Sequence, residues 1–97
     1  MNELYKVLNQ EIEYFFDEQE FMEREFLLVD VSDYVPVDED EIDSKKLVFG
    51  NEIEGIEVEE NQLKITFNRF YIKDLRNELL EEWNEQEIVK KTNWMYR

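Results

Sequence analysis

The sequence lacks the residues on which many catalytic and redox sites depend. Its 97 residues include no cysteine and no histidine, which excludes disulfides, thiol chemistry and nucleophiles activated by histidine. It has only two glycines and one proline, so it contains no glycine-rich phosphate-binding loop. We therefore expect a protein that is not an enzyme and that holds no cofactor.

Long apolar segments and targeting signals are also missing. The longest apolar run covers residues 26–29, far fewer than the ~20 residues of a membrane-spanning helix. The first residues, MNELYKV, contain neither the basic nor the apolar region of a signal peptide. With the absence of cysteine, these features predict a cytoplasmic protein without a membrane partner.

Large apolar side chains and acidic charge are what the chain has in abundance. Apolar residues make up 42% of the sequence, enough for a modest core in a single domain over residues 1–97. The formal net charge is −15, and it is unevenly distributed. Residues 1–60 hold 20 acids and 4 bases, a net of −16, whereas residues 61–97 hold 6 acids and 7 bases, a net of +1. Such charge disfavours direct binding of nucleic acid.

A β-hairpin is predicted for residues 52–68, which read EIEGIEVEENQLKITFN. Apolar and polar residues alternate on both sides of positions 61–62, as expected for two strands that share one buried face. A two-residue turn at 61–62 would place Glu59 opposite Lys64, an opposite-charge pair on the outer face. A longer loop is the alternative, because the turn lacks the favoured Asn-Gly sequence.

Helices are predicted at both ends of the chain, over residues 2–24 and 68–91. Each carries apolar side chains at helical spacing. These are Leu4, Leu8, Ile12, Phe15 and Met22 in the first helix, and Ile72, Leu75, Leu79 and Trp83 in the second. Asn68 is suited to cap the second helix, since its short side chain can accept hydrogen bonds from the first turn.

Two further strands are predicted, at 25–31 (EFLLVDV) and 45–49 (KKLVF), with an acidic loop at about 33–44 between them. Gly50 is expected to form a tight turn by adopting a positive φ, and Gly55 indicates a bulge. The fold class that follows is α+β. It consists of a small antiparallel sheet of three or four strands, packed by an N-terminal and a C-terminal helix.

A calcium site is the first binding hypothesis that the acidic loop suggests. Asp38, Asp40 and Asp43 resemble a cluster of oxygen ligands for a hard cation. An EF-hand, however, requires Gly at its sixth position and Glu at its twelfth, and counting from Asp38 these are Asp43 and Phe49. We therefore expect no metal site.

The acidic residues themselves form a candidate partner-binding surface. They occupy a row on the first predicted helix, the loop DEDEID at 38–43, and the outer side of the hairpin. The residues are Glu13, Asp17, Glu20, Asp38, Glu39, Asp40, Glu41, Asp43, Glu57 and Glu59. A solvated face is the simpler interpretation of any one row. Together, a rigid set of carboxylates can occupy a basic groove in place of DNA phosphates.

The chain resembles a known class of proteins in its size, its acidity and its lack of catalytic motifs. With DEDEID at 38–43, EIEGIEVEE at 52–60 and the helical row, the chain resembles small phage or mobile-element inhibitors that mimic DNA. Those inhibitors include anti-CRISPR and anti-restriction proteins. The resemblance implies an inhibitor in the host-cell cytoplasm that binds the basic nucleic-acid-binding groove of a nuclease or CRISPR effector.

Two alternatives remain open at this point. The chain is also similar to barstar-like and other toxin-immunity proteins, which are small acidic partners of basic nucleases. It could equally be a cytosolic adaptor or structural subunit that binds through an apolar surface. Trp94, Met95 and Tyr96 are the candidate residues for such a surface, unless they fold back to extend the core.

Overall fold

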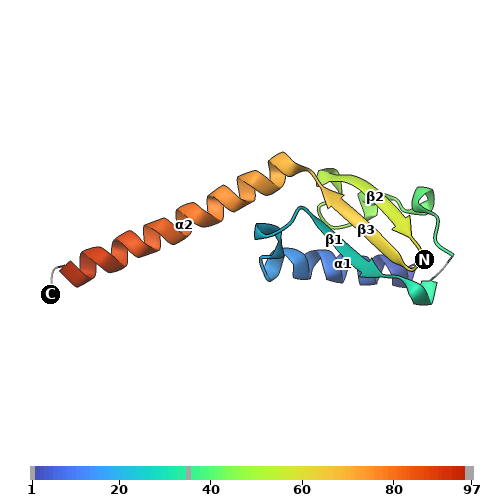
Figure 1. Cartoon of the computed structure of the whole chain (residues 1–97), viewed down its shortest axis with the longest axis horizontal. Helices are drawn as coiled ribbons and strands as arrows, with labels where there is room; N and C mark the ends of the chain where they lie inside the picture. Colours follow the sequence, from blue (N-terminus) through green and yellow to red (C-terminus); the bar gives the residue numbers. More distant parts are fainter. Residues whose placement is uncertain (1, 35, 96–97) are drawn as a thin grey trace.

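An antiparallel sheet of three strands is the centre of the fold (Figure 1). The computed structural model describes the backbone of residues 2–34 and 36–95, and the side chains of residues 3–34 and 36–83. The strands are β1 (Phe26–Asp30), β2 (Ile53–Glu59) and β3 (Gln62–Phe67), in the order β1-β3-β2. Helices α1 (Asn2–Asp17) and α2 (Arg69–Met95) flank the sheet. The predicted α+β fold class is confirmed.

The core lies between α1 and one face of the sheet. Alternate residues of the central strand, Leu63, Ile65 and Phe67, are fully buried there. The apolar stripe of α1 covers them, and the Phe15 ring stacks on Phe67 with ring centroids 5.6 Å apart. Burial of each such side chain contributes about 1.5–3 kcal/mol, so this layer holds the helix on the sheet.

The hairpin is formed by β2 and β3, but its register differs from the predicted one. The turn occupies Glu60 and Asn61, with Glu60 in the left-handed region at φ 52°. Lys64 consequently faces Glu57 rather than Glu59. The register is shifted by two residues, and such a shift leaves every side chain on its predicted face. The predicted bulge is confirmed by the register shift between Ile53 and Gly55.

The first helix ends seven residues before its predicted boundary. Gln19 adopts the left-handed conformation at φ 61°, and a short 3-10 turn, Glu20–Met22, follows it. This turn directs Phe21 into the core. Glu20 and Met22 therefore do not belong to α1, and the prediction that Glu20 continues the acidic row of the helix is wrong.

The strand predicted at residues 45–49 is absent from the described part of the chain, and a turn stands in its place. Ser44–Lys46 form a 3-10 turn because the Asp43 carboxylate accepts a hydrogen bond from the Lys45 N–H at 3.0 Å. The left-handed residue is Phe49 rather than Gly50. Gly50 is required for a different reason, since a Cβ there would overlap the carbonyl of Ser44.

The second helix begins as predicted. The Asn68 side chain accepts hydrogen bonds from the N–H groups of Phe70 and Tyr71, at 2.9 and 3.1 Å. Ile72 is fully buried, so the first turns pack on the core. Beyond them α2 extends away from the sheet (Figure 1). Trp83 is 42% exposed, and its predicted place in the inner stripe is therefore wrong.

Within the described residues, no helix is both long enough and apolar enough to cross a membrane. The side chains of Trp94 and Met95, and all of Tyr96, lie outside the described residues. The two interpretations of that terminal segment, as core or as interface, therefore stay predictions.

Candidate functional site

The acidic connection between β1 and β2 is held against α1 by two polar side chains. The Tyr5 hydroxyl accepts from the Asp43 N–H at 2.9 Å and donates to the Glu41 carbonyl at 3.4 Å. One turn further along the helix, the Asn9 carbonyl oxygen accepts from the Val48 N–H at 2.8 Å. Because residues four apart share one side of a helix, the two side chains form a single attachment line.

Two apolar residues of the same connection act as anchors. Ile42 and Leu47 are buried in the core cluster, although five of the six residues from 38 to 43 are acidic. The five acidic residues, at 38–41 and 43, are all exposed. Burial of the anchors therefore fixes the position of a segment whose charge alone would oppose compaction.

One carboxylate of the connection binds the outer edge of β2. The Val58 N–H points away from β3 and donates to the Glu39 Oε2 at 3.2 Å. An edge strand exposes unpaired backbone groups, and this contact occupies one of them. Beside it lies a shallow hollow of about 520 Å³, lined by Val58 and by loop residues including Val37 and Glu41.

This contact brings two acidic segments together. Glu57 and Glu59 flank Val58 on β2, and their exposed side chains lie on the open sheet face next to the loop. We call the combined surface the acidic edge patch. Its residues are Asp38, Glu39, Asp40, Glu41, Glu57 and Glu59. The six carboxylates come from two stretches of sequence that are joined by a side-chain hydrogen bond.

The other predicted site residues lie elsewhere. Glu13 and Asp17 project from the exposed side of α1, whereas Glu57 and Glu59 lie on the sheet face that α1 does not cover. A hollow of about 480 Å³ between α1 and the connection is lined by Glu13 and by the bases Lys6 and Lys46. Glu13 therefore shares this hollow with two bases and with no residue of the acidic edge patch.

Two further predicted residues have local partners. Glu20 forms an ion pair with Arg24, with Nη2 and Oε2 3.0 Å apart. Asp43 caps the Ser44–Lys46 turn on the side of the connection that contacts Tyr5. The ten predicted residues therefore form no single surface, and six of them form the acidic edge patch.

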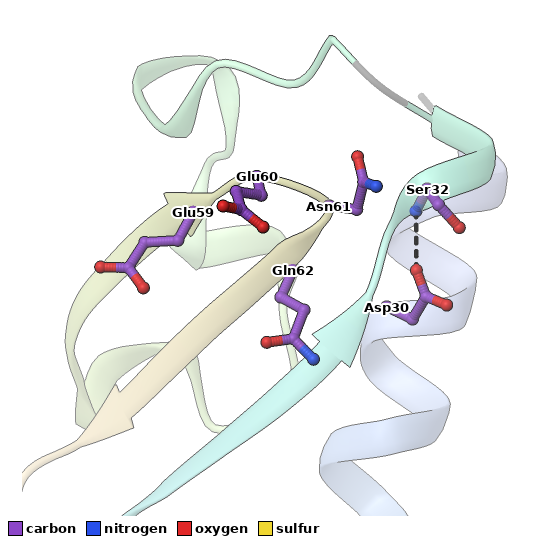
Figure 2. A pocket seen from close by; sticks show the side chains of 6 residues that line it. All are labelled: Asp30, Ser32, Glu59, Glu60, Asn61 and Gln62. Carbon is purple, nitrogen blue, oxygen red and sulfur yellow. Dashed lines mark hydrogen bonds between the residues drawn. The ribbon is translucent and has the colours of Figure 1, made fainter.

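A second acidic feature, absent from the sequence prediction, lies at the end of the sheet (Figure 2). A hollow of about 800 Å³ is lined by Asp30, Ser32, Glu59, Glu60, Asn61 and Gln62. The Asp30 carboxylate accepts a hydrogen bond from the Ser32 N–H at 2.9 Å. The N–H and hydroxyl of Ser32 hold the pKa of Asp30 below its ordinary value. Asp30 could have been identified from the sequence by pairing the end of β1 with the start of β3, which places Asp30 opposite Gln62 beside the hairpin turn.

Neither metal geometry nor similarity assigns a function to these features. No group of three or more acidic side chains in the described residues is placed to hold a metal ion. Comparison with protein-family models, curated proteins and solved structures gave no match. A function can therefore be inferred only from the charge and position of the residues themselves.

Proposed function

We propose that the protein is a non-enzymatic inhibitor whose acidic edge patch binds the basic nucleic-acid-binding groove of a nuclease or CRISPR effector. The observation that carries the proposal is the hydrogen bond from Val58 to Glu39. It joins the acidic loop to β2, so that six carboxylates share one surface instead of lying on a free loop. A fixed array of charges loses less entropy on binding than a mobile one.

The distribution of bases supports the same conclusion. No lysine or arginine belongs to the acidic edge patch, and Lys64, which faces Glu57, lies with its Nζ 4.6 Å from the centroid of the Phe26 ring. A DNA duplex presents one negative charge per ~1.7 Å, and its protein partners bind it with Lys and Arg. A surface with little internal neutralisation can attract those same side chains.

The proposal is tested first by capturing partners from the source cell at low and high salt. The expected partner is a basic nucleic-acid-binding protein that is released as salt rises and that DNA displaces. Exposed charge pairs are screened over ~8 Å at physiological ionic strength, which makes this salt dependence strong. Tight binding that does not change with salt, or a partner that DNA does not displace, would overturn the proposal.

Matched variants then locate the surface. Asp40→Asn, Glu41→Gln and Glu57→Gln together neutralise three of the six patch carboxylates and leave the Glu39 contact intact. The control is Glu11→Gln, Glu13→Gln and Asp17→Asn on α1, which changes the net charge by the same amount. We expect the patch variant to bind the captured partner roughly tenfold or more weakly, equivalent to ~1.4 kcal/mol, and the control to bind nearly normally. Equal losses would show that only net charge matters.

A toxin-immunity role would use the same surface and differ only in the partner, which the capture experiment identifies. An adaptor role is favoured by a separate observation, the exposure of Leu80 and Trp83 on α2. The double variant Leu80→Ser and Trp83→Ser distinguishes it. Loss of the partner in that variant, with normal binding by the patch variant, would support the adaptor over the inhibitor.

A further inference from the structure

The free edge of β1 has a defined hydrogen-bonding pattern. β1 pairs with β3 along one side, and the ladder continues with the Val31 N–H to the Asn61 carbonyl at 2.8 Å and the Phe67 N–H to the Glu25 carbonyl at 3.0 Å. In an antiparallel pair, hydrogen-bonded residues alternate with residues whose backbone groups point away. The N–H and C=O groups of Phe26, Leu28 and Asp30 therefore point outward.

These groups remain unoccupied within the described part of the chain, where no hydrogen bond to the outer side of β1 is formed. Leu28 is 45% exposed and Phe26 is half-buried, so the adjacent open face is partly apolar. Natural sheets usually protect such an edge with a bulge, a covering segment or a charged side chain. β2 has these devices. On β1, charged groups lie only toward the two ends, at Asp30 and at the Phe26 ring, where the Lys64 Nζ is 4.6 Å from the ring centroid; Leu28 between them has no such protection among the described residues.

The side chains along the β1 edge change from apolar to acidic, and this order indicates which kind of segment could bind there. The apolar side chains of Phe26 and Leu28 come first, and Asp30 follows at the end of the strand. Asp30 also lines the hollow of about 800 Å³ at the hairpin turn, together with Glu59 and Glu60 (Figure 2). An added strand would thus meet Phe26 and Leu28 first and the Asp30 carboxylate at the end of β1, whereas Glu59 lies two strands away on β2.

We infer that the β1 edge binds an extended segment of another protein as a fourth strand. The segment carries apolar side chains beside Phe26 and Leu28, and a lysine or arginine beside Asp30 that pairs with its carboxylate. Backbone hydrogen bonds to the three outward residues supply affinity, and alternate side chains supply specificity. The inference goes beyond the proposed inhibitor function, because the acidic edge patch lies at the opposite edge of the sheet.

A second copy of this chain fits the edge less well. Pairing two five-residue strands would bury far less than the ~1,200 Å² of a stable interface. Both copies would also carry a net charge of −15, and their repulsion would oppose pairing. A basic segment is attracted to the same surface, so charge complementarity selects it over the second copy.

The test uses the full chain and a synthetic peptide of sequence KTKTVTVT, acetylated and amidated. In an antiparallel pairing it places valines over the apolar part of the edge and a lysine over Asp30. We expect peptide at up to ~1 mM to slow the exchange of the Phe26, Leu28 and Asp30 amides by about tenfold at saturation, as measured by NMR. The control is the same peptide with N-methyl groups on its bonding edge, which keeps the charge but cannot pair.

Two chain variants separate strand pairing from general attraction. Leu28→Pro removes one outward N–H and leaves the ladder to β3 intact, because proline is tolerated where the N–H faces solvent. Leu28→Thr keeps that N–H and is the matched control. We expect the proline variant alone to lose peptide protection.

Three results would overturn the inference: no binding of the peptide, binding without amide protection at these residues, or protection that rises with protein concentration alone. The last would assign the edge to a second copy. The triple patch variant (Asp40, Glu41 and Glu57) should keep peptide protection, so failure here is distinguishable from failure of the inhibitor proposal.

Discussion

The two edges of the sheet differ in how far other parts of the chain cover them. The β2 edge is interrupted by a bulge, is flanked by the long acidic connection and has its Val58 N–H occupied by Glu39. The β1 edge presents outward backbone groups beside the exposed Leu28. The chain thus occupies one outward N–H of the β2 edge with its own acidic side chain, whereas the outward groups of β1 have no hydrogen-bond partner among the described residues.

The comparison shows how an acidic surface can be positioned without internal ion pairs. Carboxylates repel one another, so they do not hold the connection in place. Buried Ile42 and Leu47, with Tyr5 and Asn9 on α1, perform that task. Removal of these supports should release the connection and leave the β2 edge as exposed as the β1 edge.

The largest effect is expected from Ile42→Ala, which removes a buried anchor of the connection. Large-to-small substitutions of this kind typically destabilise by ~2–5 kcal/mol, and we expect the lower half of that range because the site lies beside a loop. Urea denaturation measures the change. Leu28→Ala, at the open edge, is the matched control and should change stability by less than ~0.5 kcal/mol. Equal losses would contradict the difference between the edges.

Asn9→Ala should have an intermediate effect. It removes the acceptor of the Val48 N–H, a hydrogen bond of 2.8 Å in a partly buried position. A donor left without its partner typically costs ~1–2 kcal/mol. The same denaturation experiment checks this value, with Gln10→Ala on the neighbouring exposed position as the control. A loss no greater than that of the control would show that Asn9 does not hold the connection.

Glu39 substitutions should have a smaller effect, because the contact is exposed. Glu39→Ala frees the Val58 N–H, with an expected loss of ~0.5–1 kcal/mol, whereas Glu39→Gln retains an acceptor and should lose less. Exchange of the Val58 amide should accelerate in the alanine variant more than in the glutamine variant. Identical exchange in both would mean that charge, rather than the hydrogen bond, protects this edge.

The smallest effect concerns pH and the end of the open edge. Ser32 holds the pKa of Asp30 below its ordinary value, so ionised Asp30 favours the folded state. This stabilisation is complete above the unfolded pKa of about 3.9 and is lost as pH falls through the lower folded pKa. Thermal unfolding of Asp30→Asn should therefore show a weaker dependence on acid below about pH 4 than the wild type. An identical acid dependence would contradict this role.

Much of the fold follows from the sequence because its signals are local. The alternation around β2 and β3 identified the buried face, and Asn68 identified the start of α2. The hairpin register did not follow, because a shift of two residues preserves the same faces. The left-handed residue Glu60 determines the turn, and no glycine or asparagine marks that position.

Other features depend on contacts between distant segments. Residues 45–49 have the composition of a strand, yet Asn9 binds the Val48 N–H and Leu47 is buried in the core. The charge of residues 1–60 could be counted but not placed. Glu13 and Glu57 belong to the same acidic half of the sequence, and the sheet separates them.

Amide hydrogen exchange of the free protein, followed by NMR, tests the difference between the two edges most directly. The amides of Leu28 and Val58 both point away from β3, and only that of Val58 has an acceptor among the described residues. We expect the Val58 amide to exchange at least several-fold more slowly than the Leu28 amide, while the ladder amides of Leu27 and Val29 exchange most slowly. Equal rates for Leu28 and Val58, or slower exchange at Leu28, would contradict the account.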